Sequence, residues 1–389
     1  MNQVAYKYRF YPTEEQKQLL AQTFGCVRYV YNNILEYRHN EYYQKNNSIN
    51  YSQTSAKFTE MRNEIDWLRD VSYVAIQQGL RNLDNAFSNF FKKKANYPKF
   101  KNRNAKQSFR LTSVGFRIKN GKLYIAKSKE PLDVKWSREL DLEKLNSITI
   151  SKDPANRYHV SIQGEKDMKL KPFTNKKIGI DLGLTHFCID SNGDKINNPR
   201  TTRKYAQKLK IEQRKLSKKE KGSSNYQKQK LKVARVHAKI ADTRNDFLHK
   251  LSSKIINENQ VIVLEDLAVG NMIKNKKLSK SIADVSWSKF VNMLKYKSEW
   301  YGRTFHQVNR WYPSSKTCSS CGHLHDSMPL NVRHFSCENC GEELDRDINA
   351  AKNILTVGLT ELACGDRGKS DPRSHRDNAL VSEARIPLF

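Results

Sequence analysis

Residues 178–184, which decide the fold, read Ile178-Gly179-Ile180-Asp181-Leu182-Gly183-Leu184. The stretch is aliphatic apart from one acidic residue, so it is predicted to form a buried β-strand. An ionised Asp181 in such a strand costs several kcal/mol unless a cation or hydrogen bonds compensate it. The stretch therefore indicates both a sheet and a charged group that needs a partner.

Two other acidic residues stand at similar positions. Glu265 follows a predicted strand at residues 260–264, and Asp347 begins a predicted helix at residues 347–357. If these elements converge, the three carboxylates can hold two Mg²⁺ ions about 4 Å apart, an arrangement that cleaves phosphodiesters. Each residue alone is weak evidence, because a glutamate at a strand end is usually a solvated charge.

Four cysteines form the pattern CxxC-x15-CxxC: Cys318, Cys321, Cys337 and Cys340. This spacing is typical of zinc ribbons, and four thiolates complete a tetrahedral Zn²⁺ shell that has no open position. We therefore expect one structural zinc. Three histidines in the same segment, His323, His325 and His334, are expected to pack or to touch nucleic acid.

The chain is strongly basic. Its 389 residues include 70 Lys and Arg against 40 Asp and Glu, a net charge of +30. Such an excess favours a polyanionic partner, nucleic acid above all, over the alternative of a merely soluble basic surface. Residues 200–254 hold 18 basic and 4 acidic residues and are predicted to be helical, with a break at 222–224. The predicted packing stripe of this helix is Leu231, Ala234, Ala241, Leu248, Leu251 and Ile255.

The length favours two or three domains. From residue 13 to about 95 the pattern is helical, since Thr13 and Gln16 form a capping box and apolar residues then recur at steps of three and four. Residues 103–170 instead show short apolar alternations separated by turn signals such as Asn120-Gly121, typical of a β-rich module. A short strand at residues 7–10 precedes the helices, so the helical part is predicted to be an insertion in one β-domain.

Six motifs occur in order along nearly the whole chain. They are Tyr8-Arg9-Phe10-Tyr11-Pro12, Thr23-Phe24-Gly25-Cys26-Val27-Arg28, Gly179-Ile180-Asp181-Leu182-Gly183, Leu264-Glu265-Asp266-Leu267, Ser319-Ser320-Cys321-Gly322-His323 and Asp345-Arg346-Asp347-Ile348-Asn349-Ala350-Ala351. Together they resemble TnpB, the family of RNA-guided DNA endonucleases of bacterial insertion sequences, which is related to the type V CRISPR effectors.

The resemblance implies that Asp181, Glu265 and Asp347 are the nuclease triad and bind two Mg²⁺ ions. Asp347 is chosen over Asp345 because the last metal-binding aspartate of the family stands two positions before an asparagine, here Asn349. All three acidic positions are intact, unlike those of the nuclease-dead relatives that act as guided repressors.

The resemblance also implies a multidomain α/β architecture. A β-barrel-like wedge domain is expected at 1–12 and 103–172, with a helical recognition domain inserted at 13–102. An RNase H-like RuvC nuclease domain is expected at 173–312 and 345–361, with a four-cysteine zinc ribbon at 313–344. A flexible tail is expected at 362–389.

Two groups of residues are candidates for nucleic-acid contact. A basic run interleaved with aromatics is expected to touch phosphates and bases: Lys92, Lys93, Lys94, Tyr97, Lys99, Lys101 and Arg103. The alternative is a polar loop anchored by its aromatic residues. A second group is expected to read a short DNA motif, because Gln and Arg make bidentate contacts to base edges: Tyr73, Gln77, Gln78 and Arg81.

The expected function is RNA-guided cleavage of double-stranded DNA beside a short flanking motif, directed by a transposon-derived guide RNA. There is no run of 18 apolar residues and no signal-peptide pattern. We therefore expect a cytoplasmic bacterial protein associated with the nucleoid. Three alternatives stay open: a guided DNA-binding repressor without useful cleavage, a transposase that uses the same carboxylates for strand transfer, and a plain RNA-binding protein.

Overall fold

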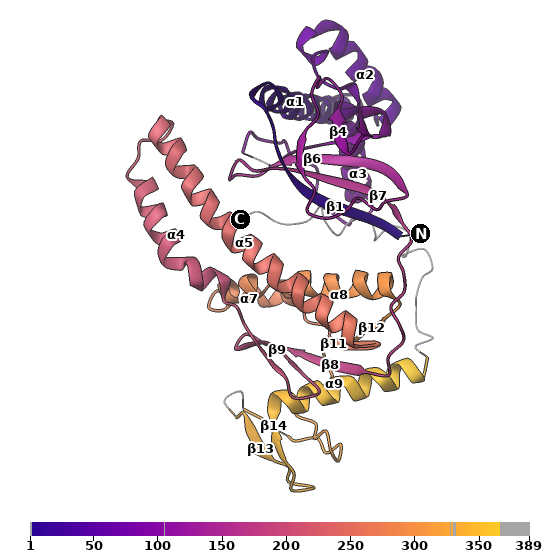
Figure 1. Ribbon diagram of the computed structural model, residues 1–389, viewed down its shortest axis with the longest axis vertical. Helices are drawn as coiled ribbons and strands as arrows, with labels where there is room; N and C mark the ends of the chain where they lie inside the picture. Colours follow the sequence, from indigo (N-terminus) through magenta and orange to yellow (C-terminus); the bar gives the residue numbers. More distant parts are fainter. Residues whose placement is uncertain (1, 105, 327, 330–331, 366–389) are drawn as a thin grey trace. The chain divides into compact units, whose positions relative to one another are not determined.

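The computed structural model describes residues 2–104, 106–326, 328–329 and 332–365 (Figure 1). Two compact units make up the chain, Met1–Asp167 and Met168–Phe389. Most of the tail predicted at 362–389 lies outside the described residues. Its first residues belong to the last helix, which extends to Ala363 and not only to the predicted end at residue 357.

An antiparallel sheet organises the first unit, in the strand order β2-β6-β7-β1-β5. The bounds are β1 Asn2–Tyr11, β2 Gln107–Thr112, β5 Asp133–Lys135, β6 Lys144–Lys152 and β7 Tyr158–Lys166. Strands β2 and β5 are its edges, whereas a closed barrel would pair them. The five-stranded sheet of the described residues is therefore open at these edges, and its closure into a barrel-like domain stays a prediction. The chain before the short strand β5 instead bridges to a neighbouring hairpin, through Leu132 and Leu123.

That hairpin consists of β3 Phe116–Lys119 and β4 Lys122–Ile125. Its turn residues Asn120 and Gly121 have φ angles of 51° and 69°. Positive φ at both positions is what a two-residue Asn-Gly hairpin turn requires. The predicted turn is confirmed.

Three helices separate β1 from β2 in the sequence, as predicted for an insertion: α1 Glu14–Lys45, α2 Tyr51–Glu64 and α3 Tyr73–Phe91. The capping box at the start of α1 is confirmed. The Gln16 N–H donates to Thr13 Oγ1 at 3.3 Å, and the Thr13 N–H donates to Gln16 Oε1 at 3.1 Å. The apolar stripes of α1 and α3 are buried: Leu20, Phe24, Val27, Tyr31 and Ile34, and Ile76, Leu80, Leu83 and Phe87.

A mixed sheet organises the second unit, in the order β10-β9-β8-β11-β12. The bounds are β8 Lys177–Leu182, β9 His186–Asp190, β10 Lys195–Asn197, β11 Val261–Glu265 and β12 Thr304–Val308. Strands β8, β11 and β12 are parallel, and β9 and β10 continue the sheet in antiparallel pairing. The helices of this unit are α4 Thr201–Ser217, α5 Ser224–Glu258, α6 Val269–Met272, α7 Ser279–Val285, α8 Trp287–Tyr301 and α9 Arg346–Ala363.

Strand alternation assigns the two faces of this sheet to different helices (Figure 1). Ile180 and Leu264 join the core formed with α5 and α8. Gly179 and Val263 point to the opposite face, along which α9 runs. A Cβ atom at Gly179 would lie 2.2 Å from the carbonyl oxygen of Ala351 in α9. The helix backbone therefore approaches β8 more closely than a side chain larger than hydrogen permits.

The basic stretch forms two helices, α4 and α5, which pack on each other and are separated by the predicted break. One prediction in its packing stripe is wrong, since Ala241 is exposed and Ile240 is buried in its place. Ala241 stands seven residues after Ala234 in the predicted stripe. A helix with 3.6 residues per turn does not return to quite the same position after seven residues, so the buried face moves away from a strict seven-residue repeat along the helix.

The ribbon segment contains two short paired strands, β13 His334–Ser336 and β14 Glu343–Asp345, directly before α9. None of the described helices combines the length and the apolarity that a membrane span requires.

We expect Gly179→Ala to lower the free energy of unfolding by about 2 kcal/mol or more, because the new Cβ atom overlaps the Ala351 carbonyl oxygen. Chemical denaturation of the purified protein measures this change. Gly270→Ala is the matched control, since nothing lies within 4 Å of a Cβ atom built there. Equal stability of the two variants would contradict the close contact.

Candidate functional site

Two carboxylates meet at the carboxyl ends of adjacent parallel strands. β11 pairs with β8 in register as far as Leu264 and Ile180, so the residues that follow, Glu265 and Asp181, lie beside each other. Leu264 and Ile180 face α5 and α8, so the next side chain on each strand points to the face that α9 covers. Strand pairing thus brings together two of the three predicted triad residues.

Helix α9 carries the third carboxylate along the same face. The helix crosses the strands in turn, since Ala351 contacts β8 at Gly179 and Gly358 contacts β11 at Val263. Asp347 lies in the first turn of the helix. It stands four residues before Ala351, which places it on the same side of the helix.

The electrostatics of the site reflects three neighbouring acids. Burial, followed by the negative charges of Glu265 and Asp347, raises the pKa of Asp181 to about 7. Burial, followed by the charge of Asp266, raises the pKa of Glu265. Arg333 donates to both carboxylate oxygens of Asp347, at 3.0 and 3.2 Å. The positive charge of Arg346 offsets these effects only in part, so a bound cation is most favourable at Asp181.

The donor set suits Mg²⁺, a hard cation that prefers carboxylate oxygens and keeps positions open for water and phosphate. Among the described residues, the three carboxylates do not form a set whose ligand atoms all lie within 4.8 Å of one another. Two ions about 4 Å apart do not require such a set, because each carboxylate can bind one ion or bridge both. The residues present therefore fit a two-metal site.

Asp345 has a structural role that differs from that of Asp347. Its side chain caps α9 by accepting the N–H groups of Asp347 at 3.1 Å and Ile348 at 3.0 Å, and Lys195 Nζ lies 2.6 Å from its Oδ2 atom. Burial alone would raise the pKa of Asp345, but the Lys195 ammonium and these N–H groups lower it. With Asp345 engaged in this way, Asp347 is the better candidate for metal binding.

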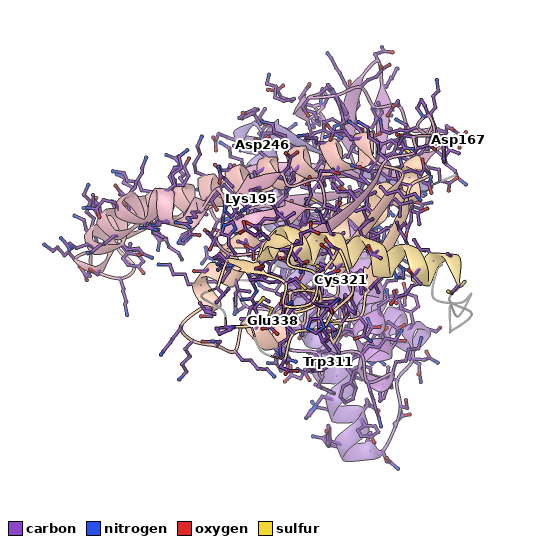
Figure 2. The ribbon with its side chains drawn as sticks, turned by 90° about the horizontal axis from the view of Figure 1, so that it is seen from below. Asp167, Lys195, Asp246, Trp311, Cys321 and Glu338 are labelled. Carbon is purple, nitrogen blue, oxygen red and sulfur yellow. The ribbon has the colours of Figure 1, made fainter. Side chains whose placement is uncertain are left out.

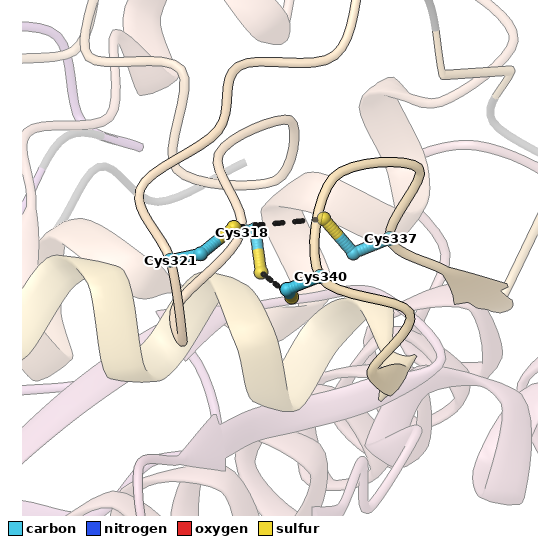
Figure 3. A group of neighbouring side chains, drawn as sticks. All are labelled: Cys318, Cys321, Cys337 and Cys340. Carbon is cyan, nitrogen blue, oxygen red and sulfur yellow. Dashed lines mark hydrogen bonds between the residues drawn. The ribbon is translucent and has the colours of Figure 1, made fainter.

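The four cysteines converge as predicted (Figure 3). The Sγ atoms of Cys318 and Cys340 lie 3.8 Å apart, and those of Cys321 and Cys337 lie 3.7 Å apart. A regular tetrahedron with Zn–S bonds of about 2.3 Å has edges of about 3.8 Å. The sulfur positions therefore fit a tetrahedral Zn²⁺ ion.

Each cysteine pair sits in the same kind of turn. The N–H groups of Gly322 and Gly341 donate to the carbonyl oxygen of the first cysteine of their pair, at 2.9 and 2.7 Å. Both glycines have positive φ, 76° and 72°, a conformation that glycine adopts without strain. The Asn339 side chain, followed by a backbone N–H, lowers the pKa of Cys321 to about 6. A low thiol pKa favours the thiolate that binds metal.

Helix α9 also holds the ribbon in place. Asn349 Nδ2 donates to the Thr317 carbonyl at 2.7 Å, and its Oδ1 accepts the Ser319 N–H at 2.8 Å. One turn later, Asn353 Nδ2 donates to the Ser314 carbonyl at 2.8 Å. Both asparagines are buried. The first two turns of α9 therefore serve the ribbon and the carboxylate site at once.

The residues predicted to read a DNA motif lie on α3: Tyr73, Gln77, Gln78 and Arg81. Tyr73 stacks on Phe58 of α2, with ring centroids 5.3 Å apart. The Arg81 guanidinium lies 4.8 Å from the centroid of the Tyr51 ring. Both side chains thus contact α2, and the two glutamines are partly exposed. Base reading by this group stays a prediction.

The basic segment after α3 divides into two kinds of residue. Tyr97 packs its ring against Phe87 and Phe90, with centroids 5.5 and 5.3 Å apart. Lys101 Nζ lies 3.8 Å from the Tyr31 ring centroid, and burial lowers the pKa of Lys101. These two residues have packing roles. The exposed members remain the candidates for phosphate contact: Lys92, Lys93, Lys94, Lys99 and Arg103.

Trp311 is a candidate that the sequence patterns did not single out (Figure 2). Its side chain is 84% exposed, and it follows β12, which pairs with β11 as far as Glu265. Its loop is held in place, since Arg310 pairs with Asp266 and the Trp311 N–H donates to Asn309 Oδ1 at 3.0 Å. One sequence signal could have identified Trp311: it is an aromatic residue just beyond a strand that borders the acidic site.

Three family models match the chain. The OrfB_IS605 model, described as "Probable transposase", matches residues 159–276. A model described as "Cas12f1-like, TNB domain" matches residues 287–354, and one described as "Helix-turn-helix domain" matches residues 1–47. The last segment consists of strand β1 and the single helix α1 with its flanking residues.

A protein of Streptomyces pristinaespiralis named "Putative RNA-guided DNA endonuclease" is 46% identical over 376 residues, which cover 96% of this chain and 93% of that protein. The chain belongs to the TnpB family. InsQ of Escherichia coli (strain K12), named in the same way, is 30% identical over 389 residues, covering 94% of this chain and 95% of InsQ. The solved Cas12f1–sgRNA–target DNA complex shares the fold, with a TM-score of 0.53 and 18% identity over 88% of this chain and 83% of that one.

The family models divide the candidate site of this TnpB chain. Asp181 and Glu265 lie within the OrfB_IS605 match, whereas Asp347 and the four cysteines lie within the TNB-domain match. The carboxylate cluster thus combines residues from two matched segments that α9 joins through its contacts with β8.

We expect Asp181→Asn to stabilise the Mg²⁺-free protein increasingly as pH rises. A carboxyl whose folded pKa is raised to about 7 costs stability as pH climbs from its unfolded value toward 7, and asparagine removes that cost. The advantage of the variant is expected to grow by about 2 kcal/mol between pH 5 and pH 8. Chemical denaturation at both pH values measures it, and an advantage independent of pH would contradict the raised pKa.

Proposed function

We propose that this chain is an RNA-guided DNA endonuclease that cuts both strands of DNA beside a short flanking motif. The observation that carries the proposal is the convergence of Asp181, Glu265 and Asp347 on one face of the sheet. It is supported by the 46% identity to a protein named for this activity.

In this proposal the three carboxylates hold two Mg²⁺ ions. When bound, the ions supply an activated water and stabilise the charge that develops on the departing 3′ oxygen. The protein contributes orientation, because strand register places Asp181 beside Glu265 and the packing of α9 on Gly179 places Asp347. Asp181 must also lose its proton to bind a cation. Because its pKa lies near 7, metal binding at this residue depends on pH.

Sequence choice is assigned to base pairing between the target and a transposon-derived guide RNA. Protein contacts to phosphates are assigned to the basic hairpin of α4 and α5 and to the exposed lysines that follow α3. The β-sheet of the first unit takes the wedge role and its inserted helices take the recognition role. The net charge of +30 suits a chain that carries RNA and DNA together.

We assign Trp311 a stacking role on an unpaired base next to the carboxylates. Nucleases that act within an opened duplex must hold a single strand, and an aromatic face binds any base with a gain of about 1–3 kcal/mol. The anchoring of Arg310 and of the Trp311 backbone leaves the indole presented on a fixed loop. A rigid platform costs little conformational entropy on binding.

Transposition is the second candidate function, because the model that matches residues 159–276 is described as "Probable transposase". The same carboxylates can promote strand transfer, which yields joined DNA products. Guided repression without cleavage is the other alternative.

A cleavage assay on the copurified RNA–protein complex tests the proposal. Sequencing of that RNA is expected to give one abundant species from the transposon end. A matched plasmid should be linearised in Mg²⁺, and Asp181→Ala should reduce the rate by at least about 100-fold, since even outer-shell metal partners are worth 10- to 100-fold. Asp246→Ala is the control, because Asp246 is 61% exposed and forms an ion pair with Lys250 on the same helix.

The outcomes separate the three functions. Simple double-strand breaks that depend on Asp181 support the nuclease. Joined products indicate a transposase. A matched target that is bound and left uncut by the wild type and by Asp181→Ala overturns the nuclease in favour of repression.

Trp311→Ala is expected to slow cleavage about 10-fold, in line with the loss of one base-stacking contact, without lowering the melting temperature. Trp311→Phe should restore most of the rate because it keeps an aromatic face. Val114→Ala is a control for an exposed apolar residue elsewhere, since Val114 is 86% exposed. An unchanged rate in Trp311→Ala would rule out the stacking role.

A further inference from the structure

A second group of metal-binding side chains lies on the ribbon, apart from the four cysteines. The residues are His323, His325 and Glu338, and one ligand atom from each lies within 4.8 Å of the others. The spacing His-x-His places both imidazoles on one side of an extended backbone. Glu338 comes from the other half of the ribbon, between the third and fourth cysteines.

The backbone holds the two histidines rigidly. Leu324, between them, forms an antiparallel bridge with Thr317. The His323 carbonyl accepts the Cys318 N–H at 2.8 Å, and the His325 N–H donates to the Lys316 carbonyl at 3.1 Å. The backbone positions of both histidines are therefore set before any ligand binds, which lowers the entropic cost of binding.

His325 supplies an independent sign of a missing ligand. The residue is only 6% exposed, and its Nε2 atom is buried without a hydrogen-bond partner among the described residues. A buried polar atom left unpaired costs about 1–3 kcal/mol, so native structures seldom leave one without a reason. The His325 ring is held edge-on against His323 and Phe335, with centroids 5.0 and 5.2 Å away. Packing fixes the ring but gives its Nε2 atom no hydrogen bond.

We propose that His323, His325 and Glu338 form a second zinc site on the ribbon. Two imidazoles and one carboxylate suit Zn²⁺ and not Mg²⁺, which binds oxygen ligands. Three protein ligands leave one position open for water or for a phosphate oxygen, in contrast to the closed four-thiolate shell. Glu338 is exposed, so the ion can enter from solvent.

Metal analysis of untagged protein tests the site. The protein is equilibrated with free Zn²⁺ held at a low micromolar level by a zinc buffer, in millimolar Mg²⁺ that occupies the carboxylates. We expect two zinc equivalents per chain in the wild type. His323→Ala and Glu338→Gln should each retain one, because the four-cysteine site is left intact. His334→Ala is the matched ribbon control, since His334 is 79% exposed and outside the group, and should keep both.

Co²⁺ distinguishes the two positions spectroscopically. The first equivalent should give the intense sulfur-to-metal absorption of a thiolate site, and the second should add only weak bands typical of nitrogen and oxygen ligands. One equivalent in the wild type, or a second that persists in both His323→Ala and Glu338→Gln, overturns the proposal. Neither readout depends on DNA cleavage, so the nuclease proposal stands or falls separately.

Discussion

The close packing of α9 on β8 is the contact on which the second unit depends. Gly179 offers no side chain, so the helix backbone at Ala351 can rest directly on the strand. Gly358 repeats the arrangement one strand further on, where a Cβ atom would lie 2.3 Å from Val263 Cγ1. One glycine in the strand and one in the helix thus allow close contact between α9 and the sheet at two points. This packing determines the position of Asp347 relative to Asp181.

The ribbon and the three carboxylates offer donor sets of different chemistry. The four thiolates suit a closed zinc shell that would shape the segment before α9. The carboxylates suit the hard cations of the proposed function, which keep positions open. Asn349 and Asn353 connect the two, because each reaches the ribbon backbone from the buried side of the helix that carries Asp347. Asn349 accepts the Ser319 N–H and Asn353 donates to the Ser314 carbonyl, so loss of either asparagine removes a hydrogen bond from the ribbon backbone.

Periodic elements could be predicted from the sequence because their signals are local. The capping box at Thr13, the turn at Asn120 and the cysteine spacing all depend on neighbours within a few residues, and all are confirmed. Other features depend on distant contacts. Lys101, in the loop after α3, lies over the ring of Tyr31 in α1. The open edges of the first sheet and the setting of Trp311 likewise follow from tertiary packing that no local pattern encodes.

The α4–α5 hairpin leaves the sheet after the edge strand β10 and returns to the interior strand β11. The two helices support each other, for example where buried Gln229 donates to the Glu212 carbonyl at 3.0 Å. The turn between them, at residues 218–223, lies far along the hairpin from the strands (Figure 1). A reporter or effector domain fused into that turn leaves the strand register untouched, which makes it the natural insertion point for engineering this protein as a compact scaffold.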